Sequence, residues 1–124
     1  MEQKKILIAD DEQDVLDVLG KKITGSSYDV VTISDGREVI DGCKSAKPDL
    51  IILDIVMPGM DGYAVASMLR KERNLESTPI IFMTAKELEY SGIQKRLSDL
   101  GFCDFIAKPF GFEELLAKIK EKIG

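Results

Sequence analysis

The sequence predicts an α/β domain in which helices cover both faces of one parallel β-sheet. Short apolar runs alternate five times with segments whose apolar residues have helical spacing. Such alternation requires crossover connections, which make the strands parallel and place helices on both faces. The run 50–53 is wholly apolar, which is typical of a strand buried on both faces. We therefore expect a doubly wound, five-stranded sheet.

Two strand–helix units fill the amino-terminal part of the chain. We expect a strand over 5–9, followed by a helix over 14–23 whose apolar residues lie on one face. A second strand over 28–33 is rich in β-branched residues. The second helix, over 37–47, is expected to stop before Pro48, because the residue before proline disfavours the helical conformation.

Three further units follow the same pattern. Asp61 is a candidate N-cap for the third helix, and Gly101 ends the fourth. The expected elements are a strand over 50–54, a helix over 61–74, a strand over 80–83, a helix within 87–100, a strand over 102–107 and a last helix from 112 onward.

Length, charge and composition limit the function classes. The 124 residues suffice for one domain with one core, and we expect a single domain over 1–124 with no output domain. A net charge of -5 argues against direct binding of nucleic acid or an anionic membrane. Neither a signal peptide nor an apolar run of ~20 residues is present, so we expect a cytoplasmic protein. His is absent, and Cys43 and Cys103 are expected to be reduced.

Polar residues stand where four of the predicted strands end. Asp10 and Asp11 follow the first strand, and Asp54 ends the third. Thr84 and Lys108 follow the fourth and fifth strands. Because the carboxyl ends of parallel strands share one edge of a sheet, these side chains are expected to line one crevice.

Three carboxylates in one crevice repel one another, and a divalent cation removes the conflict. Oxygen ligands of this kind suit Mg²⁺. A cation, the Lys108 ammonium and the Thr84 hydroxyl together would accommodate a phosphoryl group. Asp54 is then the natural nucleophile, and it would form an acyl phosphate.

These motifs, in this order, resemble the receiver domain of two-component response regulators over essentially the whole chain. Each motif alone is weak evidence, but all five at predicted strand ends are highly specific. The motifs are Asp10-Asp11, Asp54 with Met57-Pro58, Asp61-Gly62, Thr84-Ala85 and Lys108-Pro109-Phe110.

The resemblance implies a flavodoxin-like (βα)5 fold with strand order 2-1-3-4-5. It implies that Asp54 accepts a phosphoryl group from a phospho-His of a histidine kinase or phosphotransfer protein. Mg²⁺ would be bound directly by Asp11 and Asp54, through water by Asp10, and by the backbone carbonyl of Val56. Such a protein catalyses only its own phosphotransfer and dephosphorylation, so we do not expect an enzyme in the usual sense.

The resemblance also assigns the signalling machinery. Thr84 and Lys108 would bind the phosphoryl oxygens, and Phe105 matches the switch aromatic that turns inward when Thr84 moves. The Lys108–Pro109 bond is expected to be cis. A downstream target protein would meet the surface of the fourth helix, fifth strand and fifth helix, in a monomer or a phosphorylation-dependent dimer. Residues expected on that surface are Lys86, Tyr90, Lys95 and Phe105.

Two positions are expected to modulate how long the phosphoryl group persists. Val56 has no polar atom with which to orient an attacking water, and protonated Lys86 cannot act as a base. We therefore expect slow loss of phosphate for a receiver. For Lys86, a side chain that simply points to solvent is an equally good interpretation.

Other classes remain as alternatives at this stage. The chain could be the receiver piece of a larger hybrid kinase or DNA-binding response regulator. A haloacid-dehalogenase-type phosphatase needs a second Asp two residues after the nucleophile, where Val56 stands. A flavin-binding module would need a phosphate loop after the first strand, where the acids would repel phosphate. A degenerate receiver that never takes phosphate is disfavoured by the intact motifs.

Overall fold

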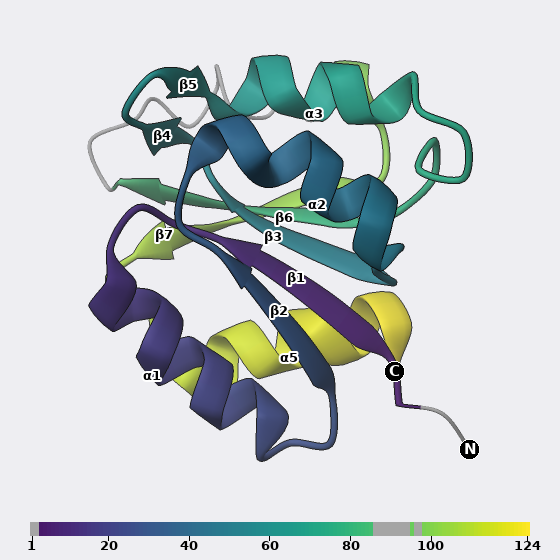
Figure 1. The fold of residues 1–124 in the computed structure, drawn as a ribbon. Coiled ribbons are helices and arrows are strands. Elements are labelled where there is room, and N and C mark those ends of the chain that lie inside the picture. Colours follow the sequence, from purple (N-terminus) through teal and green to yellow (C-terminus); the bar gives the residue numbers. More distant parts are fainter. Residues whose placement is uncertain (1–2, 86–94, 96–97) are drawn as a thin grey trace.

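The sheet has five parallel strands, as predicted (Figure 1). A computed structural model describes residues 3–85, 95 and 98–124 of the chain. The strands are β1 (Lys5–Ala9), β2 (Asp29–Ile33), β3 (Leu50–Asp54), β6 (Ile80–Ala85) and β7 (Cys103–Lys108). Their spatial order, β2-β1-β3-β6-β7, is the 2-1-3-4-5 order of a flavodoxin-like fold, and every neighbouring pair is parallel.

Helices cover both faces of the sheet, with α2 and α3 on one side and α1 and α5 on the other (Figure 1). Their bounds are α1 (Gln13–Thr24), α2 (Val39–Ala46), α3 (Gly62–Arg70) and α5 (Phe112–Ile123), and a 3₁₀ turn, η1 (Gly36–Glu38), precedes α2. Most of the helix predicted within 87–100 lies outside the described residues, although 95 and 98–100 are helical. Of the helices described, none is long and apolar enough to cross a membrane.

The core has two layers because the central strands alternate their side chains between the two faces. In β3, Ile51 and Leu53 join the layer beneath α2 and α3, whereas Leu50 and Ile52 join the layer beneath α1 and α5. All four side chains are fully buried. The wholly apolar run therefore forms a strand buried on both faces, as predicted.

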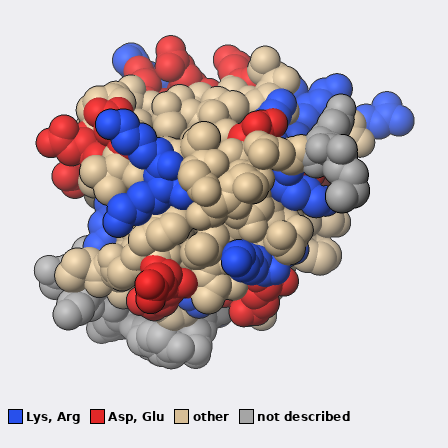
Figure 2. Space-filling view, turned by 90° about the horizontal axis from the view of Figure 1, so that it is seen from below, with Lys and Arg blue, Asp and Glu red and all other residues tan. Residues whose placement is uncertain are grey.

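The face formed by α1 and α5 carries no large patch of one charge. Figure 2 shows positive and negative side chains spread around a mostly uncharged centre on this side of the molecule. Val18 of α1 is among the few large apolar side chains exposed there, at 53%. Lys22 of α1 lies over the Phe112 ring of α5, with 5.6 Å between its Nζ atom and the ring centroid.

Two predicted boundaries are wrong in instructive ways. The second helix opens as the 3₁₀ turn η1, which the Asp35 carboxylate caps by accepting from the Arg37 backbone N–H. The third helix ends at Arg70, four residues before the predicted end at Asn74. Asn74 has a positive φ of 73°, which is incompatible with a continuing right-handed helix.

The turn after Asp54 is larger than predicted. It forms a small antiparallel hairpin between β4 (Val56–Met57) and β5 (Met60–Asp61), with Gly59 at the tip in the left-handed region (φ 71°). Asp61 then caps α3 as predicted, because its carboxylate accepts from the Tyr63 backbone N–H at 2.9 Å.

The two cysteines are free thiols. Cys43 is fully buried, and burial raises its pKa to about 12. Cys103 is partly buried at the start of β7, and its pKa is also raised, chiefly by burial. Both features agree with the reduced state expected from the sequence.

Arg70 connects the end of α3 to the loop that enters β7. That loop is unusual, because Gly101 and Phe102 both have positive φ values, of 72° and 54°, and a positive φ is costly for a bulky side chain. The Arg70 guanidinium donates to the carbonyl oxygens of Leu75 (3.0 Å), Leu100 (3.3 Å), Gly101 (2.9 Å) and Phe102 (3.4 Å), and contacts Cys103 Sγ at 3.6 Å.

Replacing Arg70 with Met should lower the free energy of unfolding by about 2 kcal/mol, because partly buried carbonyl groups lose a charged donor. Arg73→Met, at an exposed position three residues later, is the matched control and should change stability by less than about 0.5 kcal/mol. Urea unfolding measures both. Equal stability of the two variants would contradict the role given to Arg70.

Candidate functional site

Two neighbouring strands bring acidic residues to the same edge of the sheet. Ala9 of β1 pairs with Leu53 of β3, so that Asp10 and Asp54 are the next residues on adjacent strands. Asp10 is held by its backbone N–H, which donates at 3.1 Å to the carbonyl oxygen of Ile33, the last residue of β2. The parallel order thus produces the convergence that the sequence predicted.

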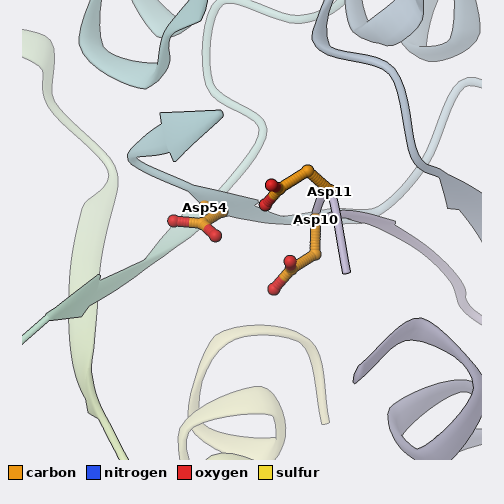
Figure 3. Close-up of side chains that lie close together, drawn as sticks. All are labelled: Asp10, Asp11 and Asp54. Atoms are coloured by element: carbon orange, nitrogen blue, oxygen red, sulfur yellow. The ribbon is translucent and has the colours of Figure 1, made fainter. Parts of the chain in front are cut away.

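Asp10, Asp11 and Asp54 form one carboxylate cluster (Figure 3). Each contributes an oxygen atom, and these atoms all lie within 4.8 Å of one another. Asp10 is fully buried, Asp11 is exposed, and the Asp54 side chain is 13% exposed. The cluster is therefore anchored in the core on one side and open to solvent on the other.

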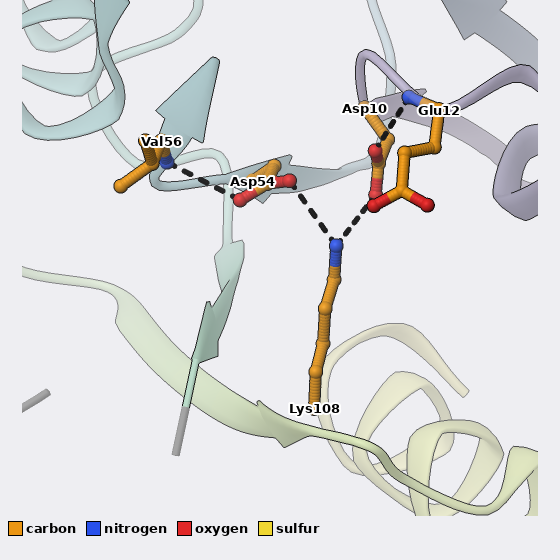
Figure 4. A network of polar contacts seen from close by, with 5 residues as sticks. All are labelled: Asp10, Glu12, Asp54, Val56 and Lys108. Carbon is orange, nitrogen blue, oxygen red and sulfur yellow. Dashed lines mark hydrogen bonds and ion pairs between the residues drawn. The ribbon is translucent and has the colours of Figure 1, made fainter. Parts of the chain in front are cut away.

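Lys108 lies between two of these acids (Figure 4). Its Nζ atom donates to Asp10 Oδ2 at 2.9 Å and to Asp54 Oδ2 at 3.1 Å. Lys108 is the last residue of β7, and the Lys108–Pro109 bond that follows is cis, as the resemblance implied. The ammonium group offsets part of the negative charge of the cluster.

Backbone groups orient the same two carboxylates. The Glu12 N–H donates to Asp10 Oδ1 at 2.9 Å, and the Val56 N–H donates to Asp54 Oδ1 at 3.2 Å. Each carboxylate thus has one oxygen on a backbone N–H and the other on Lys108 (Figure 4). The sequence did not predict this arrangement, in which Lys108 is shared between two acids.

Burial and charge act in opposite directions on the pKa values of this site. Burial raises the pKa of Asp54, the Lys108 ammonium lowers it, and the nearby Asp10 raises it, so that the net shift is upward. Burial lowers the pKa of Lys108, but the hydrogen bond to Asp10 and the charge of Asp54 outweigh burial and raise it overall. The raised pKa of Lys108 favours its charged form, and the raised pKa of Asp54 disfavours its ionised form.

Thr84 lies at the same edge on β6. It is 3% exposed and comes one residue after Met83, the strand partner of Asp54. Phe105 pairs with Phe82 across β6 and β7 and packs against the core layer beneath α2 and α3. The predicted switch aromatic therefore lies on the face of the sheet that α2 and α3 cover.

The predicted modulating and surface positions are only partly described. Val56 is 69% exposed directly beside Asp54, and Lys95 is exposed. Lys86 and Tyr90 lie outside the described residues. Glu12 is exposed and contributes its backbone rather than its side chain to the hydrogen bonds of the site.

The donor set suits Mg²⁺. The three carboxylates offer hard oxygen ligands from one solvent-facing cluster. Such a cation would favour the ionised form of Asp54, whose pKa is raised chiefly by burial and further by the nearby Asp10. Asp10, Asp11 and Asp54 are therefore the residues of the described chain that could hold it.

The strand order is that of a flavodoxin-like α/β domain, a class that includes signalling receiver domains. Residues 6–120 match the family model of the response regulator receiver domain, and the chain belongs to that family. Receiver domains act in two-component systems, where they interact with histidine kinases and downstream effectors, and they generally bind Mg²⁺ at an acidic pocket.

Individual relatives agree with this assignment. The chain is 38% identical over 117 residues to the alkaline phosphatase synthesis transcriptional regulatory protein PhoP of Bacillus subtilis, covering 94% of this chain and 47% of that protein. The chain spans about half the length of the curated relatives that it matches.

Solved structures give the same result. The chemotaxis protein CheY4 of Vibrio cholerae superposes with a TM-score of 0.89 at 26% identity, covering 98% of this chain and 99% of that one. The receiver domain of a signal transduction histidine kinase from Syntrophus aciditrophicus has a TM-score of 0.83 at 31% identity, covering 97% and 89%. The same kind of domain thus occurs in a transcriptional regulator, a chemotaxis protein and a histidine kinase.

Replacing Lys108 with Met should raise the pKa of Asp54 further, because the ammonium that favours its ionised form is removed. A carboxyl whose folded-state pKa exceeds its ordinary value of 3.8 destabilises the fold as the pH rises from that value through the folded pKa. In the Lys108→Met variant, the loss of folding stability should therefore continue to a higher pH.

The measurement is a ¹³C NMR titration of the Asp54 carboxyl group without divalent cations. Lys118→Met is the matched control, because Lys118 pairs with Asp104 rather than with the carboxylate cluster, at 3.2 Å. It should leave the Asp54 titration unchanged. An Asp54 pKa that is unchanged or lower in Lys108→Met would contradict the prediction.

Proposed function

We propose that the domain is a phosphorylation-operated switch in which Asp54 accepts a phosphoryl group from a phospho-His of a histidine kinase or phosphotransfer protein. The observation that carries this proposal is the joint placement of Asp10, Asp11, Asp54 and Lys108 at one strand edge. Family membership supports it.

In the proposed reaction, an Asp54 carboxylate oxygen attacks phosphorus, the phosphorus–nitrogen bond breaks and the imidazole leaves, which gives an acyl phosphate on Asp54. Bound Mg²⁺ would supply charge neutralisation of the phosphoryl oxygens, with Asp10, Asp11, Asp54 and the Val56 carbonyl as its proposed ligands. Lys108 would turn its ammonium to a phosphoryl oxygen, which is a charge-assisted contact.

The output of the switch follows from the same groups. The Thr84 hydroxyl would donate a hydrogen bond to the phosphoryl group. Phe105 would change its packing on the face of the sheet that α2 and α3 cover. That change would alter the surface of helix four, β7 and α5, where a downstream protein binds. A swing from mostly off to mostly on requires about 5 kcal/mol of differential stabilisation.

The proposal includes several coarser features of the protein. The domain acts on itself and turns over no separate substrate, works in the cytoplasm without contacting nucleic acid directly, and is a monomer or a phosphorylation-dependent dimer. The same chemistry would serve if the domain acts within a longer hybrid kinase or DNA-binding regulator. The relatives about twice as long as this chain make that arrangement a reasonable alternative.

Incubation with acetyl phosphate and Mg²⁺ should add one phosphoryl group, seen by mass spectrometry as a gain of about 80 Da. Asp54→Asn removes the nucleophile and should abolish the gain, as should chelation of Mg²⁺. Asp61→Asn changes an acid that only caps α3 and serves as the control that keeps the gain. Absence of any gain in the unaltered protein, under conditions that phosphorylate other receivers, would refute the proposal.

The exposed Val56 side chain should prolong the phosphorylated state, because an apolar group beside Asp54 cannot orient an attacking water. Val56→Asn should accelerate decay several-fold by supplying a polar group. Phos-tag electrophoresis after removal of the donor follows both proteins, with Val18→Asn of α1 as an exposed control. Rapid decay in the unaltered protein would contradict the expectation of slow loss.

A further inference from the structure

Gly62 is the residue at which the chain returns to the end of β3, the strand that carries Asp54. The β4–β5 hairpin leaves β3 after Asp54, and Gly62 begins α3 immediately after the hairpin. The Gly62 N–H donates to Ile55 O at 2.7 Å. The first residue of α3 is thus hydrogen-bonded to the residue that follows the phosphoacceptor.

No side chain fits at this contact. A Cβ atom on Gly62 would lie 2.7 Å from Ile55 Cα, 2.9 Å from Asp54 O and 2.9 Å from Ile55 O. All three are backbone atoms, so a Cβ atom on Gly62 could be accommodated only if the backbone at the end of β3 or the start of α3 moved. Val56, which holds Asp54 Oδ1 through its N–H, is the next residue after Ile55.

The opposite side of the hairpin is also closely packed. A Cβ atom on Gly36 would lie 2.5 Å from Met60 Sδ and 2.7 Å from Met60 Cβ. Met60 belongs to β5 and pairs with Met57 of β4. The start of α3 is therefore in tight contact with the chain at Asp54 and Ile55, and η1 is in tight contact with the hairpin through Met60.

Local propensity does not account for Gly62. Alanine at a helical position is favoured over glycine by about 1 kcal/mol. Among the described glycines with a positive φ, Gly62 does not appear, so it is not required for a left-handed conformation. The close approach to the backbone at Asp54 and Ile55 is the physical reason for glycine here.

We infer that Gly62 is a positioning residue for the cation site, setting the place of the 54–56 backbone and thereby of the Asp54 carboxylate and the Val56 carbonyl. The inference rests on the proposed function, because it takes those groups as Mg²⁺ ligands. Gly36 supports the same hairpin through Met60. Residues that orient metal ligands typically change metal affinity by about 10- to 100-fold when replaced.

The test is the dissociation constant for Mg²⁺ alone, measured by amide NMR shifts on the unphosphorylated protein. Gly62→Ala should weaken Mg²⁺ binding at least about tenfold. Gly20→Ala is the matched control, because a Cβ on that α1 glycine meets nothing closer than 3.8 Å, and Mg²⁺ affinity should stay unchanged. A purely structural role would lower the midpoint of thermal unfolding and leave the dissociation constant unaltered.

Each outcome decides the inference. A folded Gly62→Ala protein that binds Mg²⁺ as tightly as Gly20→Ala overturns it. If Gly62→Ala does not fold, Gly36→Ala is decisive, because it moves the hairpin through Met60. Weaker Mg²⁺ binding by that variant supports the inference, and unchanged binding overturns it. Failure of the unaltered protein to bind Mg²⁺ refutes the proposed function, and the inference falls with it.

Discussion

The ion pairs of Lys108 with Asp10 and Asp54 are the interaction on which the site depends. Three carboxylates and one ammonium leave the cluster with a formal charge of two minus, which one divalent cation neutralises. In the proposed reaction, the Asp54 carboxylate, with one negative charge, is converted to an acyl phosphate with about two negative charges. The cluster would then have excess negative charge, and among the described residues the Thr84 hydroxyl is a further possible donor at that edge. This imbalance of charge would favour the proposed movement of Thr84 toward the phosphoryl group.

Much of this site was predictable because a parallel sheet has only one carboxyl edge. Once five strands alternate with helices, the polar residues at their ends must meet, whatever the details of the loops. Asp10, Asp11, Asp54 and Lys108 could therefore be placed together before any coordinates. The sharing of Lys108 between two acids could not, because it depends on which oxygen of each carboxylate a backbone N–H already occupies.

Elements that depend on tertiary contacts were less predictable. The strands β4 and β5 have two residues each, too few to have a detectable period. The Arg70 side chain, at the end of α3, donates hydrogen bonds to a loop about thirty residues away in the chain, and no local propensity encodes such contacts. From the sequence, Gly62 is only part of the Asp61-Gly62 motif, and its short distance from the backbone at Asp54 and Ile55 reveals the geometric requirement.

The attachments at the two ends of α3 have a mechanical consequence. Gly62 joins its start to the residue after Asp54, and Arg70 joins its end to the loop that enters β7. α3 therefore connects the end of β3, which carries Asp54, to the loop that enters β7, which carries Lys108. β7 is an edge strand, and edge strands ordinarily fray. Because the Arg70 contact fixes the entry to β7, the β7 amides that bond to β6 should exchange with solvent more slowly than is usual for an edge strand.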